Sequence, residues 1–164
     1  MAEVLLRRRL DERGVLVHVG SGGFLEAGLP AMEDAVATMA ESGYDLSGHR
    51  SRIVTPDMVE QADLVVTMSH EHGIELGVMV PNAWSKVFQI KDFLRRVEST
   101  GSHRHGKPFA VWLEEVGGDR TRAGFLTANR EDDVADPVGQ SRQQFDRTRC
   151  LLDELFTKLA GVLN

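Results

Sequence analysis

Two helices are predicted in the first part of the chain from the spacing of apolar residues. Between residues 30 and 43 the apolar side chains recur every three or four positions, with Pro30 suited to a first helical turn and Gly43 to the end. The opening stretch MAEVLLRRRL is rich in strong helix formers and stops at Gly14. This pattern predicts a short amphipathic helix with a charged outer face.

Three short apolar segments alternate with helical ones. VLVHV at 15–19 and ADLVVTM at 62–68 are rich in β-branched residues, and KVFQI at 86–90 continues into a helical pattern. Thr55 and Ser69 each stand where a helix would be capped, one before each of the following helices. The alternation predicts an α/β fold in which helices cover both faces of a parallel sheet.

The last third of the chain contains an irregular stretch and a long helix. Residues 100–132 have no sustained period apart from a possible helix around Trp112, so we interpret them as a surface insertion within a single domain spanning residues 1–164. Ser141 and Gln144 have the spacing of a capping box ahead of a long helical pattern that runs to Leu163.

Composition and charge narrow the functional classes. A net charge of -6 and a pI near 5.5 argue against a nucleic-acid or anionic-membrane partner, because either calls for a concentrated basic patch. The apolar runs are shorter than a membrane span and no signal peptide pattern is present, so we expect a cytoplasmic protein. The single cysteine, Cys150, excludes an internal disulfide and agrees with a reducing compartment.

Four stretches together resemble the low-molecular-weight protein-tyrosine phosphatases: MAEVLLRRRL, the SGGF turn, SGYDLSGHRSRIVTPDMVEQADLVVTM and DVADPVGQS, in this order. The resemblance covers nearly the whole chain outside 100–132. In that family the MAE stretch follows a first strand and a phosphate-binding loop made of a cysteine, five residues, an arginine, a serine and a proline. The resemblance therefore implies a three-layer α/β fold whose first strand and phosphate loop would precede Met1.

The resemblance also implies a general acid. Asp136, in the stretch DVADP, matches the aspartate that the family places before a proline beside the phosphate site. Without the resemblance, the Asp-Pro pair would indicate an ordinary loop turn. Asp133 is interpreted as a solvated turn charge. Val138 stands where the family commonly has an aromatic wall for the phosphotyrosine ring, so the preference for an aryl substrate is open.

Other positions match the rim of the family site. Ser21 matches a serine that supports the phosphate loop, and Phe24 is a candidate for the pocket wall, although SGGF also fits a glycine turn with one packed aromatic residue. His72 matches a rim position. His49 lies in a stretch that lines the other side of the family site, where a solvated loop is the alternative.

The family nucleophile has no counterpart at Cys150. The residue six positions further on is Phe156 rather than arginine, and Cys150 lies inside a predicted helix, away from any free helix N-terminus. We expect no metal site, because His70 and His72 are two residues apart on a predicted helix and His103 and His105 lie in the irregular stretch. No cofactor is expected either.

Several functions stay open at this point. The chain is a phosphatase whose true start lies further upstream, or a member that has lost catalysis and serves as a binding or assembly module. Arsenate reduction on this fold uses extra cysteines, which the chain lacks. The interpretation as a flavodoxin-like nucleotide-binding protein is supported only by the glycine-containing turn SGGF. The expected partners are a phosphoprotein or small aryl phosphate once the missing loop is supplied, and a second copy of the chain paired through open strand edges.

Overall fold

Two of the three predicted strands pair in parallel, which confirms the α/β fold class. The computed structural model describes residues 1–101, 106–127 and 130–164. β1 spans Val65–Thr67 and β2 spans Val87–Gln89, with Val65 opposite Val87 and Thr67 opposite Gln89. The chain crosses from one strand to the other through a helix, as parallel neighbours require.

Helices make up most of the remaining described structure. They are α1 (Ala2–Asp11), α2 (Glu33–Glu41), α3 (Pro56–Gln61), α4 (His70–Met79), α5 (Ile90–Thr100), α6 (Phe109–Gly117), α7 (Arg122–Leu126) and α8 (Arg142–Leu163), with short 3₁₀ turns η1 (Pro81–Lys86) and η2 (Arg130–Asp132). None of the helices in the described ranges is long and apolar enough to cross a lipid bilayer.

Two predicted helix caps are confirmed and one is wrong. The hydroxyl of Thr55 accepts a hydrogen bond from the Met58 amide, and that of Ser69 accepts one from the His72 amide, each at 3.3 Å. Ser141 is the N-cap residue of α8 but makes no such bond through its side chain. Its backbone carbonyl accepts the Gln144 amide at 2.8 Å instead, so this N–H is already satisfied and the capping box does not form.

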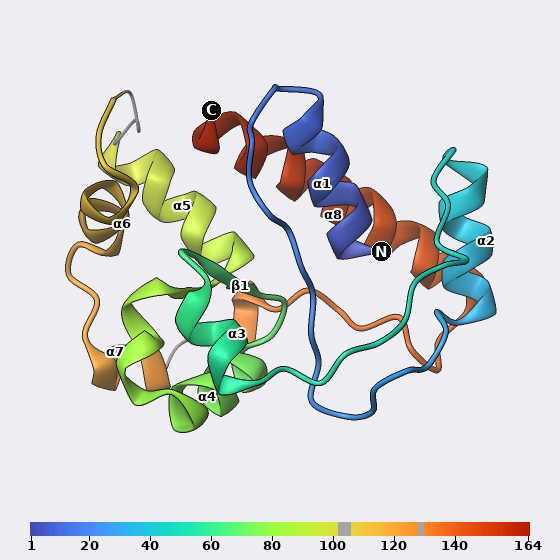
Figure 1. The fold of residues 1–164 in the computed structure, drawn as a ribbon, viewed down its shortest axis with the longest axis horizontal. Coiled ribbons are helices and arrows are strands. Elements are labelled where there is room, and N and C mark those ends of the chain that lie inside the picture. Colours follow the sequence, from blue (N-terminus) through green and yellow to red (C-terminus); the bar gives the residue numbers. More distant parts are fainter. Residues whose placement is uncertain (102–105, 128–129) are drawn as a thin grey trace. The chain divides into compact units, whose positions relative to one another are not determined.

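The chain divides into two compact units. Unit 1 consists of Met1–Val54 and Asp136–Asn164, and unit 2 is Thr55–Ala135. In unit 1, α1 and α2 both pack on α8, and α1 lies alongside α8 in Figure 1. The Arg9 guanidinium of α1 donates two hydrogen bonds to Asp153 of α8, at 2.9 and 2.7 Å. The prediction of one domain over residues 1–164 stays a prediction.

The predicted strand at 15–19 is wrong. These residues form no ladder with any described segment, and Leu16 is 97% exposed. The described hydrogen bonds hold the two ends of the segment: the Val15 amide donates to the Leu10 carbonyl, and the Val19 carbonyl accepts a hydrogen bond from Arg7 at 2.9 Å. A β-branched run forms a strand only where a neighbouring strand takes its hydrogen bonds, and this unit offers none.

The core of unit 2 contains a chain of aromatic rings. Phe88 of β2 packs edge to face on Phe93 of α5, with centroids 5.1 Å apart, and Phe93 packs in the same way on Trp112 of α6 at 5.9 Å. Trp112 is fully buried, so part of the stretch 100–132 belongs to this core and does not lie on the surface. Whether the stretch is an insertion relative to the family stays a prediction. His103 and His105 lie outside the described residues.

Candidate active site

The candidate acid lies at an exposed turn. One carboxylate oxygen of Asp136, Oδ1, accepts the Val138 amide at 3.0 Å, and the Gln140 amide donates to the Pro137 carbonyl, also at 3.0 Å. Gly139 closes this turn with a φ of 74°, a conformation that glycine adopts without strain. The second carboxylate oxygen makes no hydrogen bond to any residue that the structure describes. Asp136 is exposed, and one of its carboxylate oxygens is therefore left without a partner in the described chain.

The residues just before this turn are tied to the carboxyl ends of both strands in unit 2. The Val134 amide donates to the Met68 carbonyl at 2.8 Å, after the end of β1. The Asp133 carboxylate accepts the His70 amide at 2.7 Å and the Gln89 side-chain amide at 2.9 Å. Asp133 is half-buried and bound, so its interpretation as a solvated charge is wrong. The first free N–H groups of α4 attract a carboxylate, and Asp133 satisfies one of them.

Ser21 lies in unit 1 and belongs to a charged cluster. Its hydroxyl donates to the carboxylate of Glu3, which also pairs with Arg7 at 2.6 Å and Arg52 at 3.4 Å. Burial alone would raise the pKa of Glu3, but the hydrogen bonds from Ser21 and Arg7 and the positive charges of Arg7 and Arg52 together hold the pKa below its ordinary value. Among the described contacts of Ser21, none reaches Asp136.

The remaining predicted site residues differ in exposure. Phe24 is half-buried beside Gly23, whose amide donates to the Arg52 carbonyl at 2.8 Å. Val138 follows Asp136 by two residues and is 58% exposed. His72 lies in unit 2 on the first turn of α4, where its backbone takes part in the Ser69 cap and its side chain is exposed. These positions therefore remain candidates whose roles are proposals.

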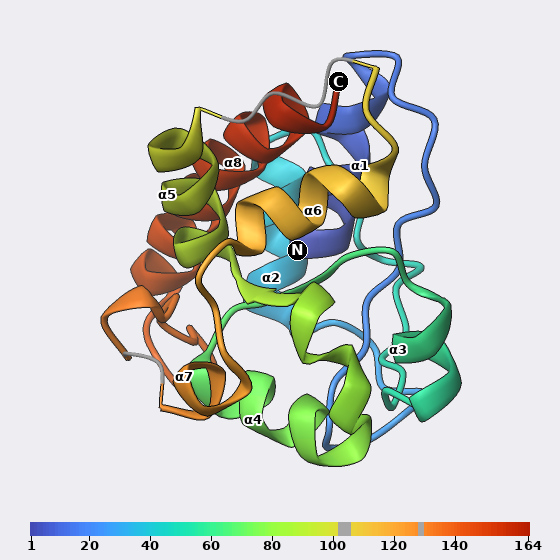
Figure 2. The same ribbon diagram turned by 90° about the vertical axis from the view of Figure 1, so that its left-hand side faces the viewer.

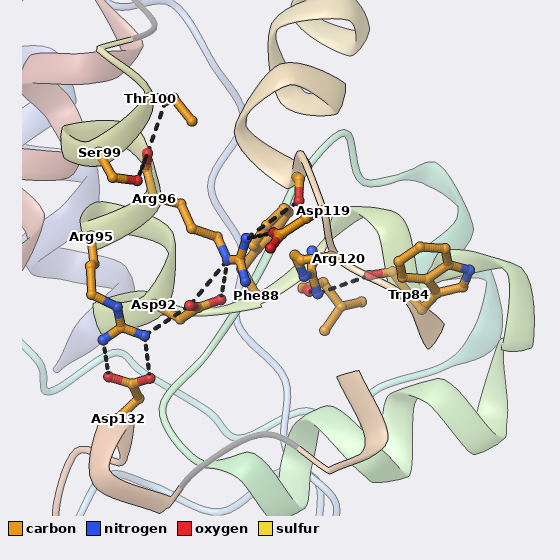
Figure 3. Close-up of polar contacts among 12 residues, drawn as sticks. Trp84, Phe88, Asp92, Arg95, Arg96, Ser99, Thr100, Asp119, Arg120 and Asp132 are labelled. Carbon is orange, nitrogen blue, oxygen red and sulfur yellow. Dashed lines mark hydrogen bonds and ion pairs between the residues drawn. The ribbon is translucent and has the colours of Figure 1, made fainter. Parts of the chain in front are cut away.

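Sequence reasoning missed a cavity in unit 2. It has a volume of about 340 Å³ and is lined by residues of β1, β2, α4, α5, α7, η2 and the link between α6 and α7. Figure 3 shows its charged residues: Arg95 and Arg96 come from α5, and Arg120 lies on the link. The lining carboxylates are Asp92, Asp119 and Asp132.

Two of these arginines are neutralised by carboxylates. Arg95 forms a two-bond ion pair with Asp132, 2.8 Å for each hydrogen bond, and also contacts Asp92. Arg96 binds the other side of Asp92 at 2.9 Å and reaches Asp119 at 3.1 Å. The hydrogen bonds from Arg95 lower the pKa of Asp132, although burial acts against them. The i,i+3 and i,i+4 spacing of Asp92 with the two arginines was a signal in the sequence that could have indicated this network.

No group of three histidine, cysteine, aspartate or glutamate side chains in the described part of the chain is arranged to hold a metal ion. Cys150 is exposed on α8, where the neighbouring Arg149 guanidinium donates to its sulfur at 2.9 Å. Because Cys150 lies well inside α8, the helical backbone amides near it are not free to bind a phosphate group.

Comparison with known proteins identifies relatives along the whole chain. The protein-arginine-phosphatase of Bacillus subtilis strain 168 is 29% identical over 164 residues, covering 99% of this chain and 87% of that protein. The low molecular weight protein-tyrosine-phosphatase Etp of Escherichia coli K12 is 30% identical over 131 residues, covering 79% and 84%.

Solved structures agree with this relationship. A mutant of YwlE from Bacillus subtilis is 28% identical, with a TM-score of 0.71 over 98% of this chain and 86% of that chain. A low molecular weight protein tyrosine phosphatase from T. tengcongensis is 25% identical, with a TM-score of 0.70 over 96% and 86%. The family model for low molecular weight phosphotyrosine protein phosphatase matches residues 1–105. The chain belongs to the low molecular weight phosphotyrosine protein phosphatase family.

Proposed function

We propose that this chain provides the frame and the general acid, Asp136, of a protein phosphatase, and that its 164 residues alone do not turn over a phosphomonoester. In the family reaction a cysteine thiolate attacks phosphorus, and the acid gives its proton to the leaving atom, which is an oxygen in a phosphomonoester and a guanidino nitrogen in phosphoarginine. Water then attacks the phosphocysteine and releases phosphate and the thiolate. The observation that carries the proposal is the exposed Asp136 turn, with one carboxylate oxygen in use and the other open.

The proposed inactivity depends on the missing nucleophile. Cys150 is the one cysteine in the sequence, and the residue six positions later is Phe156, which is almost fully buried. No arginine therefore stands where the family motif needs one to hold the phosphate oxygens. A cysteine-to-serine mutant of the YwlE arginine phosphatase carries a phosphorylated active-site serine, which supports a phosphoryl group on the corresponding residue of that relative.

For the substrate, we propose a phosphorylated protein side chain without an aromatic ring. The support is Val138, which is exposed where the family commonly has an aromatic wall for phosphotyrosine. A relative of the whole chain is named as a protein-arginine-phosphatase, so phosphoarginine is the substrate to test first, against an aryl phosphate.

The test compares two forms of the protein. One is the chain as it stands, and the other carries a family first strand and Cys-x5-Arg-Ser-Pro loop joined before Met1. We expect no turnover by the first form. The extended form should turn over substrate, and Asp136→Asn should lower its kcat by about 10²- to 10⁴-fold. Asp63→Asn, at an exposed position in unit 2, is the matched control and should leave kcat unchanged.

Two outcomes would contradict the proposal. Turnover by the unextended chain that disappears in Cys150→Ser would show that Cys150 is the nucleophile after all. An extended chain that folds but stays inactive would favour a non-catalytic binding module on the same fold. Arsenate reduction would require a reducible cysteine pair, which the unextended chain does not have.

We further propose that two copies of the chain associate through the extended segment at 15–20 of unit 1. Leu16 is 97% exposed and Val17 is 52% exposed, and the backbone between Val15 and Val19 has no strand partner among the described residues. Such a segment pairs readily with another strand. Light scattering at micromolar concentration should give about twice the 18.2 kDa chain mass, and Val17→Pro should return it to the monomer value. A monomer for the unmodified chain would exclude this association.

A further inference from the structure

Arg120 occupies an unusual position in the cavity of unit 2. One of its terminal nitrogens, Nη2, donates to the Val87 carbonyl at 2.6 Å and to the Trp84 carbonyl at 3.2 Å. The guanidinium carbon lies 3.8 Å from the centre of the Phe88 ring, and the Phe125 ring is 5.6 Å away. This packing removes water from the cation, and burial lowers the pKa of Arg120 to about 10.

The charge of Arg120 has no carboxylate partner among the described residues. Arg95 and Arg96 each form ion pairs with aspartates, whereas the contacts of Arg120 within the described structure are with carbonyl oxygens and ring faces. Its second terminal nitrogen, Nη1, is buried and makes no hydrogen bond within the described structure. Burying a cationic N–H without an acceptor costs free energy. A ligand that supplies the acceptor recovers this free energy when it binds.

We propose that this cavity binds a small oxyanion of the phosphate class and that Arg120 is its principal binding residue. Arginine suits such a ligand because its fork of N–H groups matches two oxygens of a phosphate. Arg95 and Arg96 line the same cavity, but their charges are paired with Asp92, Asp119 and Asp132. Arg120 is therefore the cation that is left for an anion among the described lining residues. A volume of about 340 Å³ leaves room for a free phosphate or a phosphorylated side chain. All of the lining residues belong to unit 2, whereas Asp136 belongs to unit 1, and the proposal does not depend on the proposed function.

Entry of the ligand requires a local movement. Nη1 is closed to solvent, so an oxygen reaches it only after a neighbouring side chain shifts. Phe125 is placed to do this, because it lines the cavity and belongs to α7, a helix of five residues that packs against α4 (Figure 2). A ring on so short a helix moves at smaller cost than Phe88, which is fixed in the sheet.

The experiment uses the chain as it stands, titrated with inorganic phosphate at constant ionic strength and followed by ¹H–¹⁵N NMR. We expect the amide signals of Gly73, Thr121 and Gly124 to shift, since these residues line the cavity. Arg120→Met keeps the apolar stem over Phe88 but removes the charge, and should weaken phosphate binding by about tenfold or more. Arg122→Met, at an exposed position on α7, is the matched control and should bind phosphate like the unmodified chain.

Each outcome decides the proposal. No phosphate-dependent shifts at these amides, or equal affinity in Arg120→Met, would overturn it. Because Arg120→Met could lose its fold, a thermal melt without phosphate accompanies the titration. If that variant is unfolded, Phe125→Ala replaces it and should bind phosphate at least as tightly as the unmodified chain, because removal of a ring near the guanidinium widens the cavity. Weaker binding by Phe125→Ala would overturn the proposal. A second titration with a short phosphopeptide distinguishes a phosphorylated side chain from free phosphate by which of the two binds more tightly.

Discussion

Two apolar segments of similar composition adopt different structures in this molecule. The segment at 15–19 and β1 at Val65–Thr67 are both rich in valine and both precede a polar turn. β1 pairs with β2, and its last residue, Thr67, is 5% exposed. Leu16, in contrast, is 97% exposed on an extended segment without a described ladder. A high β propensity therefore means that a segment would fit into a sheet. The segment becomes a strand only where a neighbouring strand pairs with it.

The largest expected contrast is in the free energy of unfolding. Phe88→Ala on β2 should lower it by about 3–5 kcal/mol, because the ring is almost fully buried between Phe93 and Arg120. At concentrations too low for two copies to associate, Leu16→Ala should change it by less than about 0.5 kcal/mol, because within one chain the side chain has almost no contacts to lose. Urea unfolding followed by circular dichroism measures both. A large effect of Leu16→Ala would mean that the segment at 15–19 is covered in solution, as in the proposed association.

A second contrast concerns the polar groups that follow each segment. Asp133→Ala removes the acceptor for two hydrogen bonds at the ends of β1 and β2, and we expect a loss of about 1–3 kcal/mol. Ser21→Ala, after the segment at 15–19, should cost at most about 1 kcal/mol, because Glu3 keeps its pairs with Arg7 and Arg52. Equal losses in the two variants would show that the residues before Asp136 are held no more firmly than Ser21.

The smallest expected effect is on the acid side of the pH profile. Asp132 in unit 2 and Glu3 in unit 1 both have lowered pKa values, relative to 3.8 and 4.5. Each carboxylate contributes its full stabilisation of the folded state above these ordinary pKa values. The stabilisation is lost as the pH falls below them and through the lower folded-state pKa. Asp132→Asn and Glu3→Gln should each make the decline between about pH 5 and 2 shallower. Their cost at pH 7 should stay near or below 1 kcal/mol, because the partner arginines are about half exposed. An unchanged acid slope in both variants would contradict the assigned ion pairs.

The sequence predicted the local features of the fold better than the long-range ones. Helix periodicity and the Thr55 and Ser69 caps depend on residues within one or two turns, so they were predicted with nearly the observed ends. The absence of a strand at 15–19 depends on what lies beside it in space. For the same reason, the bound state of Asp133 was missed, since its partners His70 and Gln89 are 63 and 44 residues away.

The sequence carries less signal for the cavity than for the candidate acid, whose role stays a prediction. Asp136 belongs to a short contiguous stretch, DVADP, that resembles a family motif. Arg120 reaches the cavity because its guanidinium packs on Phe88, 32 residues earlier, and nothing in the spacing of a lone arginine indicates that contact. A basic residue between two helices is normally solvated, so burial of this one depends on tertiary packing alone.

Helix α4 carries two buried glycines, Gly73 and Gly77, where alanine would favour the helix by about 1 kcal/mol each. A methyl group at position 77 would lie 2.8 Å from a ring atom of Phe125, whereas one at position 73 would fit at 3.7 Å. Positions 77 and 125 therefore constrain each other during evolution. A related sequence with alanine at 77 should carry a smaller residue at 125, and one with glycine at 77 is free to keep the aromatic ring. Such paired changes would reveal, from sequences alone, which relatives close the cavity in the same way.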